Sequence, residues 1–451
     1  MWEEVARAAA GPHVGRIQAI DVVYCHTWQY DDPPRRLAER LAVEPARLHY
    51  SGIGGTTPQQ LVQDNAERIR RGEFDLVLLV GGEALATQRR WKKAGERYPY
   101  SYKPDEKRPF PWEAPFHPSE VAHEVFQAWL TFAIFENARR AHLGVPLDEY
   151  RRQLGEQWAA FTKVAAANPD AWFPIERTAE EIVTASPTNR MVGYPYTKYM
   201  VSIMDVDMSA ALLLASHECA DALGVSADDR VYLRGTAYAT DPVYVAEHPD
   251  LWRSPAMESG SAAALAAAGV GIDDIAHLDL YSCFGSSVNF GRDALGLAPD
   301  DPRGFTVTGG LPYHGGAGSD YVTHSIATMA RRLRADPGSV GLVSGVGMHM
   351  TKHAFGVYST EPGPASPPPE ISEPERVPIV DRHEGAAVVA AYSVVHGADG
   401  APEWGVAVCD VPAGRCYARI DDHERLEAAE VEELVGATVT LVPDGAVNRV
   451  A

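Results

Sequence analysis

Short apolar runs alternate with helical patterns through the first 95 residues. Ile17–Tyr24 and Asp75–Val80 are two such runs, and between them a helical spacing of apolar positions begins at Thr57-Pro58-Gln59. Proline is tolerated in the first turn of a helix, so this segment predicts a helix entered from a glycine-rich loop. Strands that are apolar along their whole length and alternate with helices are typical of a parallel sheet covered on both faces. The pattern predicts a layered α/β architecture.

A proline-rich stretch between residues 96 and 118 interrupts this alternation and excludes a helix or a central strand there. From Glu120 to about Ala185 the spacing becomes helical and rich in aromatic residues. Residues 96–200 are therefore predicted to form a helical cap of the kind that walls a substrate pocket. The segment Ser202–Ser216 then predicts a buried strand that closes the first half of the molecule.

The same order of patterns returns after Val231. Predicted strands at Ile275–Tyr281, Phe305–Thr308 and Gly341–Val346 accompany a predicted helix at Val322–Leu333. In each half a strand is followed by a loop of small residues and then by a helix. This arrangement gathers backbone N–H groups and helix N-termini on one edge, where an anion or oxyanion can bind. The chain is thus expected to contain two repeated halves, residues 1–230 and 231–360.

The C-terminal part of the chain has a different character. Residues 361–378 are rich in proline and predict a stiff, extended linker. Beyond it, short β runs separated by turn residues predict a five-stranded barrel of the oligonucleotide/oligosaccharide-binding (OB) type over residues 379–451. The runs are Ala386–Val395, Trp404–Cys409, Cys416–Ile420 and Ala437–Leu441. Barrels of this type bind many ligands, so the barrel names none.

Composition narrows the class of protein. The 451 residues include 45% hydrophobic and 22% charged residues, as in soluble globular proteins. A net charge of −21 with no basic stripe argues against a nucleic-acid partner. No apolar run reaches the roughly 18 residues that span a bilayer, and no membrane partner is expected. Five scattered cysteines predict neither a disulfide framework nor a metal site, and they favour a reducing, cytoplasmic location.

Four stretches, taken in order, resemble the thiolase superfamily: His49–Gln59, Asp279–Phe284, Thr308–Gly316 and Gly341–Gly347. The resemblance covers essentially the whole chain. It is closer still to the thiolase-like proteins type 1 of actinobacteria, which carry the same C-terminal barrel. It implies the thiolase fold, a homodimer, and a coenzyme A thioester as substrate in lipid metabolism, with no further cofactor. Family members usually open with a strand, whereas this sequence begins in a helix. We therefore expect either that the first sheet has lost a strand or that the start codon is misassigned.

The first two motifs depart from the thiolase pattern. A thiolase uses a cysteine at a helix N-terminus, where the dipole and a nearby histidine lower the thiol pKa. Here Gly54 or Gly55 falls at that position, and Thr57 falls where the family keeps a hydroxyl. In the second motif Tyr281 replaces the oxyanion-hole histidine. Thiolysis through an acyl-cysteine is therefore not predicted.

The other two motifs depart as well. Gly315-Gly316 falls where the family has Gly-His-Pro, with His314 two positions early, and Gly345-Val346 replaces the acid/base cysteine of the fourth motif. Steroid side-chain retro-aldolases also resemble thiolases, have tyrosine in the second motif and work with an OB-fold partner protein. Their chemistry requires only removal of a hydroxyl proton and protonation of an enolate.

The candidate catalytic residues are Tyr281, His314, Tyr313, Tyr321 and Cys283. The candidate substrate-binding residues are Gly54, Gly55, Thr57, Gly309, Gly310, Gly315, Gly316, Gly345 and Gly347. Three functions stay open. The first is retro-aldol-type cleavage or formation of a C–C bond in an acyl-CoA. The second is a non-catalytic acyl-CoA-binding or scaffold subunit. The third is acyl transfer of the acetyl-CoA acetyltransferase type, which would need Cys283 as nucleophile.

Overall fold

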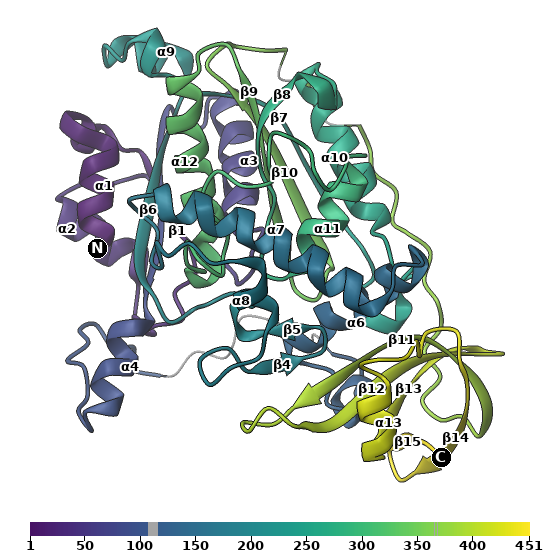
Figure 1. The fold of residues 1–451 in the computed structure, drawn as a ribbon. Helices are drawn as coiled ribbons and strands as arrows, with labels where there is room; N and C mark the ends of the chain where they lie inside the picture. The colour runs from purple at the N-terminus through teal and green to yellow at the C-terminus, as the bar shows by residue number, and fades with distance from the viewer. Residues whose placement is uncertain (107–115, 365, 368) are drawn as a thin grey trace.

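The structure is a computed structural model that describes residues 1–106, 116–364, 366–367 and 369–451 (Figure 1). Residues 107–115 of the predicted cap lie outside the described residues. So do Ala365 and Pro368 of the predicted linker.

The first sheet has the strand order β2-β1-β3-β6. Its strands are β1 (Ala19–Val22), β2 (Arg47–Tyr50), β3 (Leu76–Ala84) and β6 (Asp207–Ala215). The first three are parallel, and β6 runs antiparallel to β3. The apolar runs at β1 and β3 are buried, as predicted. The predicted strand at Ser202–Ser216 is shorter and only half-buried, because β6 lies at the edge of the sheet.

Helices cover this sheet on both faces. Apolar side chains of α1 (Trp2–Ala10) and α2 (Pro33–Leu41) pack on one face against alternate residues of β3. On the other face, α3 (Thr57–Arg70) contributes Leu61 and Val62 to the core that contains Leu79. The predicted helix at Thr57 is therefore confirmed, and it lies between the two halves of the molecule. The short helix α9 (His217–Ala222) follows β6.

The second sheet has the order β7-β10-β9-β8. Its strands are β7 (Tyr232–Thr240), β8 (Ile275–Asp279), β9 (Val340–Gly347) and β10 (Lys352–Ser359). The helix α10 (Pro255–Ala268) packs on β7 and β10, and α11 (Gly285–Ala294) lies beside α10. The helix α12 (Tyr321–Ala335) lies with α3 between the two sheets (Figure 1). The predicted run Phe305–Thr308 is not a strand, although the Phe305 oxygen accepts a hydrogen bond of 2.9 Å from the Leu280 N–H.

The predicted cap is helical and covers the second half. It contains α5 (Pro118–Ala122), α6 (Ala128–His142), α7 (Leu147–Ala167) and α8 (Ala179–Val183). The helix α4 (Leu85–Lys93) directly follows β3, precedes the predicted cap and contacts β6. A short hairpin of β4 (Met191–Gly193) and β5 (Tyr196–Thr197) completes it. Side chains of α6 and α7 belong to the same core as those of α11.

The C-terminal strands form a closed five-stranded barrel, as predicted. They are β11 (Gly385–His396), β12 (Pro402–Val411), β13 (Gly414–Ile420), β14 (Thr438–Asp444) and β15 (Val447–Val450). Pairing of β12 with β11 closes the barrel, and α13 (His423–Ala428) packs on β12. The cap hairpin reaches the barrel through pairing of Gly193 with Val395. In the described residues, no helix has the length and apolar character needed to cross a membrane.

Candidate functional site

Three of the four motif stretches meet where α3 begins. A Cβ atom placed on Gly55 would clash with the backbone oxygen of Val346 and with the Tyr281 hydroxyl, and would lie 2.7 Å from Tyr281 Cζ. A Cβ on Gly345 would lie 3.1 Å from the Gly55 oxygen. The phenol of Tyr281 therefore fills the space that a side chain at residue 55 would need.

The remaining residues of the first and fourth motifs shape the same turn. The Thr57 N–H donates to the Gly54 oxygen at 3.1 Å. Gly54 has a φ of 154°, and a Cβ on Gly347 would lie 3.3 Å from the Thr56 hydroxyl oxygen. These candidate binding residues are thus grouped around the first turn of α3. Their contact with a substrate remains a prediction.

Tyr281 is held rigidly on the loop after β8. Its backbone N–H donates to the Ser344 hydroxyl at 2.9 Å, and its ring contacts the Tyr321 ring edge-on at 5.6 Å. Burial, and secondarily the nearby Cys283 thiol, raises the pKa of the phenol above its ordinary value. The hydroxyl is therefore protonated at neutral pH and suited to donate a hydrogen bond to an oxyanion.

Cys283 is poorly suited to nucleophilic catalysis. Its Sγ lies 3.6 Å from the Ser287 hydroxyl, and burial raises the pKa of the thiol to about 12. The attacking species in cysteine catalysis is the thiolate, which is favoured by an electropositive setting. This environment favours the thiol.

Tyr321 belongs to a hydrogen-bond network around a buried carboxylate. Asp279 accepts hydrogen bonds from the Val307 N–H at 2.9 Å and the Thr306 hydroxyl at 2.8 Å. The Tyr321 hydroxyl lies 2.6 Å from the Thr308 hydroxyl oxygen and donates to Asp279 at 3.3 Å. Asp279 and Tyr321 together fix the start of the glycine-rich third motif.

The glycines of the third motif pack closely against other parts of the chain. A Cβ on Gly309 would lie 2.5 Å from Ala165 Cβ, and one on Gly310 would lie 2.6 Å from Phe161. Both glycines have positive φ, 105° and 79°, which favours glycine in itself. Gly315 and Gly316 likewise approach other residues, which are Met208 for the first and Ser202 for the second. Packing thus explains glycine at all four positions without a ligand.

The side chains of the adjacent residues Tyr313 and His314 lie in different surroundings. The Tyr313 ring faces Trp158 of the cap at 6.0 Å, and its buried hydroxyl has no hydrogen-bond partner among the described residues. The His314 ring lies 6.0 Å from the Tyr321 ring. Burial lowers the pKa of His314 to about 3, so its imidazole is neutral. Tyr281, Tyr321 and His314 thus form a series of ring contacts that Tyr313 does not join.

Sequence reasoning missed the acidic partner of His324. Asp320 and His324 are buried, and His324 Nε2 lies 3.5 Å from an Asp320 carboxylate oxygen. The His314 and His324 rings are 5.5 Å apart. The sequence does contain a signal for this pair. His324 follows Asp320 by four residues at the start of a helix, and residues four apart share a helix face. His324 alone had suggested only capping or packing.

Sequence reasoning also missed Glu83, at the end of β3. Its carboxylate accepts hydrogen bonds from the His26 N–H at 2.7 Å and the Thr27 N–H at 2.8 Å. A Cβ on Gly318 would lie 2.6 Å from Glu83 Oε1, and the next residue, Ser319, accepts a hydrogen bond of 3.1 Å from the Gly54 N–H. Burial raises the pKa of Glu83 to about 6. The Glu83 carboxyl group therefore titrates in the mildly acidic range. It lies against Gly318, and the neighbouring residue Ser319 contacts the first motif at Gly54.

A carboxylate of the protein itself occupies the N-terminus of α11. The buried Glu136 accepts hydrogen bonds from the hydroxyls of Tyr150 at 2.5 Å and Tyr196 at 2.6 Å, and from the Asn289 amide at 2.9 Å. The Tyr196 hydroxyl accepts one from the Ser286 N–H at 3.0 Å. The anion-binding position expected at this helix start is thus filled from the cap. In the described part of the chain, no three His, Cys, Asp or Glu side chains are grouped to hold a metal ion.

Comparison with known proteins gives matches among solved structures. The chain is similar to the crystal structure of a monomeric SCP2-thiolase like protein type 1 from Mycobacterium smegmatis, with 32% sequence identity and a TM-score of 0.85. That match covers 100% of this chain and 95% of the relative. An acetyl-CoA acetyltransferase from Syntrophomonas wolfei matches at 15% identity and a TM-score of 0.55, over 80% of this chain and 93% of that one, and supports the fold alone. No protein-family model and no curated protein matches the chain.

Proposed function

The chain belongs to the SCP2-thiolase-like proteins type 1 of the thiolase superfamily, and on this premise we propose that it binds an acyl-CoA and cleaves or forms a C–C bond by retro-aldol-type chemistry without a cysteine nucleophile. The observation that carries the proposal is the exclusion of a side chain at Gly55 by the Tyr281 hydroxyl and the Val346 oxygen. In this proposal the protonated phenol of Tyr281, next to the first turn of α3, stands where the resemblance to thiolases implies that the chemistry takes place.

In this proposal the substrate is a β-hydroxyacyl-CoA. A base removes the β-hydroxyl proton, the Cα–Cβ bond breaks, and its electron pair forms the enolate of the thioester. Tyr281, whose hydroxyl is protonated at neutral pH, donates a hydrogen bond to the developing oxyanion. The proposed base is the neutral imidazole of His314, which the burial that lowers its pKa to about 3 makes a weak base. It takes the β-hydroxyl proton as the carbonyl compound leaves and returns this proton to Cα of the enolate, which gives a shorter acyl-CoA.

A second candidate is a non-catalytic acyl-CoA-binding or scaffold subunit. It is favoured by the burial of Tyr281 and Cys283 and by the close packing of Gly309 and Gly310 against the cap. Acyl transfer through Cys283 is disfavoured by the raised pKa of that thiol. The homodimer expected from the resemblance has no support from the comparison, because the Mycobacterium smegmatis relative is described as monomeric.

Calorimetry with acyl-CoAs, followed by a retro-aldol assay on β-hydroxyacyl-CoAs, tests the proposal. We expect wild type and Tyr281→Phe to bind alike and the variant to lose about a hundredfold in turnover, as for removal of one oxyanion donor. Tyr392→Phe is the matched control, because that hydroxyl donates to the Ala429 oxygen inside the barrel. If no acyl-CoA binds, the acyl-CoA assignment is wrong. Binding without turnover by the wild type would instead support the non-catalytic subunit.

A further inference from the structure

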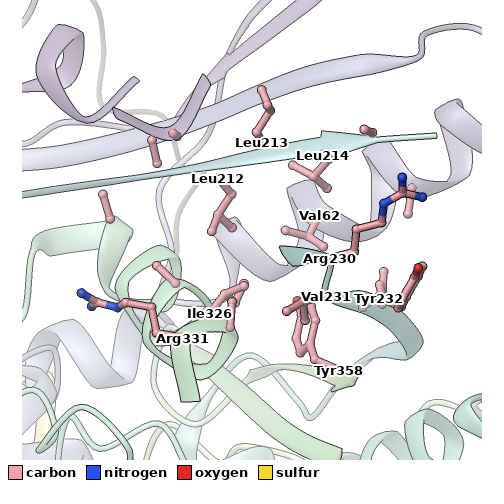
Figure 2. Close-up of a pocket in the computed structure, with 18 of the residues that line it drawn as sticks. Val62, Leu212, Leu213, Leu214, Arg230, Val231, Tyr232, Ile326, Arg331 and Tyr358 are labelled. Carbon is pink, nitrogen blue, oxygen red and sulfur yellow. The ribbon is translucent and has the colours of Figure 1, made fainter. Parts of the chain in front are cut away.

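The largest groove of the molecule corresponds to the place of a strand. It has a volume of about 1910 Å³ and lies along the outer edge of β6, where Figure 2 shows Leu212 and Leu214 on the side of Ile326. In the second sheet, β10 is antiparallel to β9 as β6 is to β3, and β10 pairs along its far edge with β7. Because the two halves repeat, the groove matches the position of β7. The proposed function places its substrate instead at the first turn of α3.

The turn that follows the fourth motif is strained on both sides of one histidine. Met348 and Met350 have positive φ, 57° and 61°, a conformation that residues other than glycine rarely adopt. The Thr351 N–H donates to the Gly347 oxygen at 3.3 Å and closes the turn, which joins β9 to β10. Such strain persists only where the surrounding structure holds it, and it clusters at functional sites. The residue between the two methionines is His349.

This turn lies close to the first turn of α3. The Val346 oxygen and the Tyr281 hydroxyl both lie against the position that a Cβ on Gly55 would take. His349 follows Val346 by three residues, which span at most about 11 Å, and the closed turn shortens this distance. The imidazole of His349 is therefore within reach of an acyl group that contacts the Tyr281 hydroxyl.

The cap holds one nitrogen of His349 and leaves the other free. His349 Nδ1 lies 2.6 Å from the hydroxyl oxygen of Thr131 in α6. The ring of the next residue, Phe132, stacks on Phe284 of the second motif at 4.8 Å, so this part of α6 packs against two of the motifs. His349 is 7% exposed, and its Nε2, which is not fully buried, has no hydrogen-bond partner among the described residues. The helix thus fixes the imidazole through Nδ1 and leaves Nε2 available to a ligand.

The Thr131 hydroxyl also determines where the imidazole carries its proton. Burial lowers the pKa of His349 to about 4, so the ring is neutral at pH 7 and has one N–H group. The hydroxyl has one proton and two acceptors, which are His349 Nδ1 at 2.6 Å and the Ala128 oxygen at 3.1 Å. Donation along the shorter contact leaves the imidazole proton on Nε2. A neutral histidine in this tautomer presents a hydrogen-bond donor at Nε2.

We propose that His349 is a second hydrogen-bond donor to the substrate and that its Nε2–H donates to the thioester oxygen that Tyr281 also contacts. This inference rests on the proposed function and adds a catalytic residue to it. Negative charge grows on the thioester oxygen as the enolate forms, and two preorganised donors stabilise that charge more than one donor does. Nε2 is the nitrogen that takes this role, because Nδ1 is occupied by Thr131.

The test uses the full-length protein and acetyl-CoA labelled with ¹³C at the thioester carbonyl. Acetyl-CoA has no β-hydroxyl group, so its binding and the polarisation of its carbonyl are measured apart from turnover. We expect His349→Leu to bind it about tenfold more weakly in calorimetry, as for the loss of one hydrogen bond. The infrared band of the bound carbonyl should lie at a higher frequency in this variant than in wild type. His349→Gln, whose side-chain amide can donate a hydrogen bond, should restore part of both effects.

Thr131→Val tests the orienting contact in a protein that keeps His349. It removes the donor to Nδ1 at nearly constant volume, so ¹⁵N spectra of histidine-labelled protein should show the proton shared between the two nitrogens. The carbonyl band should move in the same direction as in His349→Leu. The matched control is His396→Leu, because His396 is also 7% exposed and pairs with Glu430 in the barrel. This control should bind acetyl-CoA as wild type does.

Two results would overturn the proposal. Equal affinity and equal carbonyl frequency in wild type, His349→Leu and Thr131→Val would show that His349 does not contact the thioester, and the proposed function would stand without it. No binding of acetyl-CoA to the folded wild type would remove the proposed function and this inference together. Circular dichroism establishes that each variant is folded, and if His349→Leu does not fold, Thr131→Val carries the comparison with wild type.

Discussion

Gly55 is glycine because of packing against two other motifs. An added Cβ would meet the Tyr281 hydroxyl and the Val346 backbone oxygen, and a backbone oxygen in a strand has little freedom to move. We expect Gly55→Ala to lower the free energy of unfolding by about 2 kcal/mol, in the range of overpacked sites. Gly52, in the same loop, has nothing within 4 Å of its Cβ position, so Gly52→Ala should be nearly neutral. Urea denaturation measures both, and equal values would contradict this explanation.

Glu83 should make stability depend on pH in the mildly acidic range. Burial raises its pKa from 4.5 to about 6, so between these values the folded state binds more protons than the unfolded state. The free energy of unfolding therefore falls as pH rises through this window, by about 2 kcal/mol from this group. Denaturant midpoints at pH 4.5 and pH 7 should show a smaller fall in Glu83→Gln than in wild type. An unchanged difference would mean that Glu83 does not titrate there.

At the scale of elements, Glu136 joins the cap helix α6 to the start of α11. Its removal leaves the hydroxyls of Tyr150 and Tyr196 without their buried acceptor. We expect Glu136→Ala to destabilise the protein by about 3 kcal/mol, as for other broken buried networks. Glu149→Ala on the surface of α7 removes an exposed pair with Arg152 and should change the free energy of unfolding far less. Chemical denaturation of both variants checks the difference.

The elements that the sequence predicted well are those with strong local periodicity. The buried run at β3 and the amphipathic helix α12 carry their signal within one segment. By contrast, β7 and β10 mix glycine and alanine with aromatic and polar residues, and their strand character comes from pairing with each other and with β9. The half-burial of β6 was missed because edge position depends on the order of strands, which one strand's sequence does not contain.

At the scale of the whole molecule, the barrel is tied to the rest of the chain by buried polar contacts. The Tyr417 hydroxyl donates to Glu120 at 2.7 Å and accepts from the Ala246 N–H at 2.9 Å. The Tyr194 N–H donates to the Val394 oxygen at 2.8 Å, which extends β11 into the cap hairpin.

Because these contacts are buried, we expect the barrel and the two halves to unfold in one cooperative transition. Calorimetry should give one transition in wild type, and the amides of β12 and β9 should lose protection from hydrogen exchange together as the temperature rises. Tyr417→Phe should lower this common midpoint, since Glu120 and Ala246 lose a buried partner. Loss of protection in β12 at a lower temperature than in β9 would show that the barrel unfolds by itself.

The sequence by itself determined the two α/β halves, the helical cap, the barrel and the absence of cysteine at the motif positions, because local periodicity and residue identity carry that information. Tertiary structure alone decided how the candidate residues are grouped. It places the Tyr281 hydroxyl against Gly55, turns Tyr313 toward the cap, and brings Glu83 beside Gly318. These contacts join residues more than 150 positions apart. Burial, which sets the pKa values of Tyr281, Cys283 and Glu83, exists only once the layers have packed.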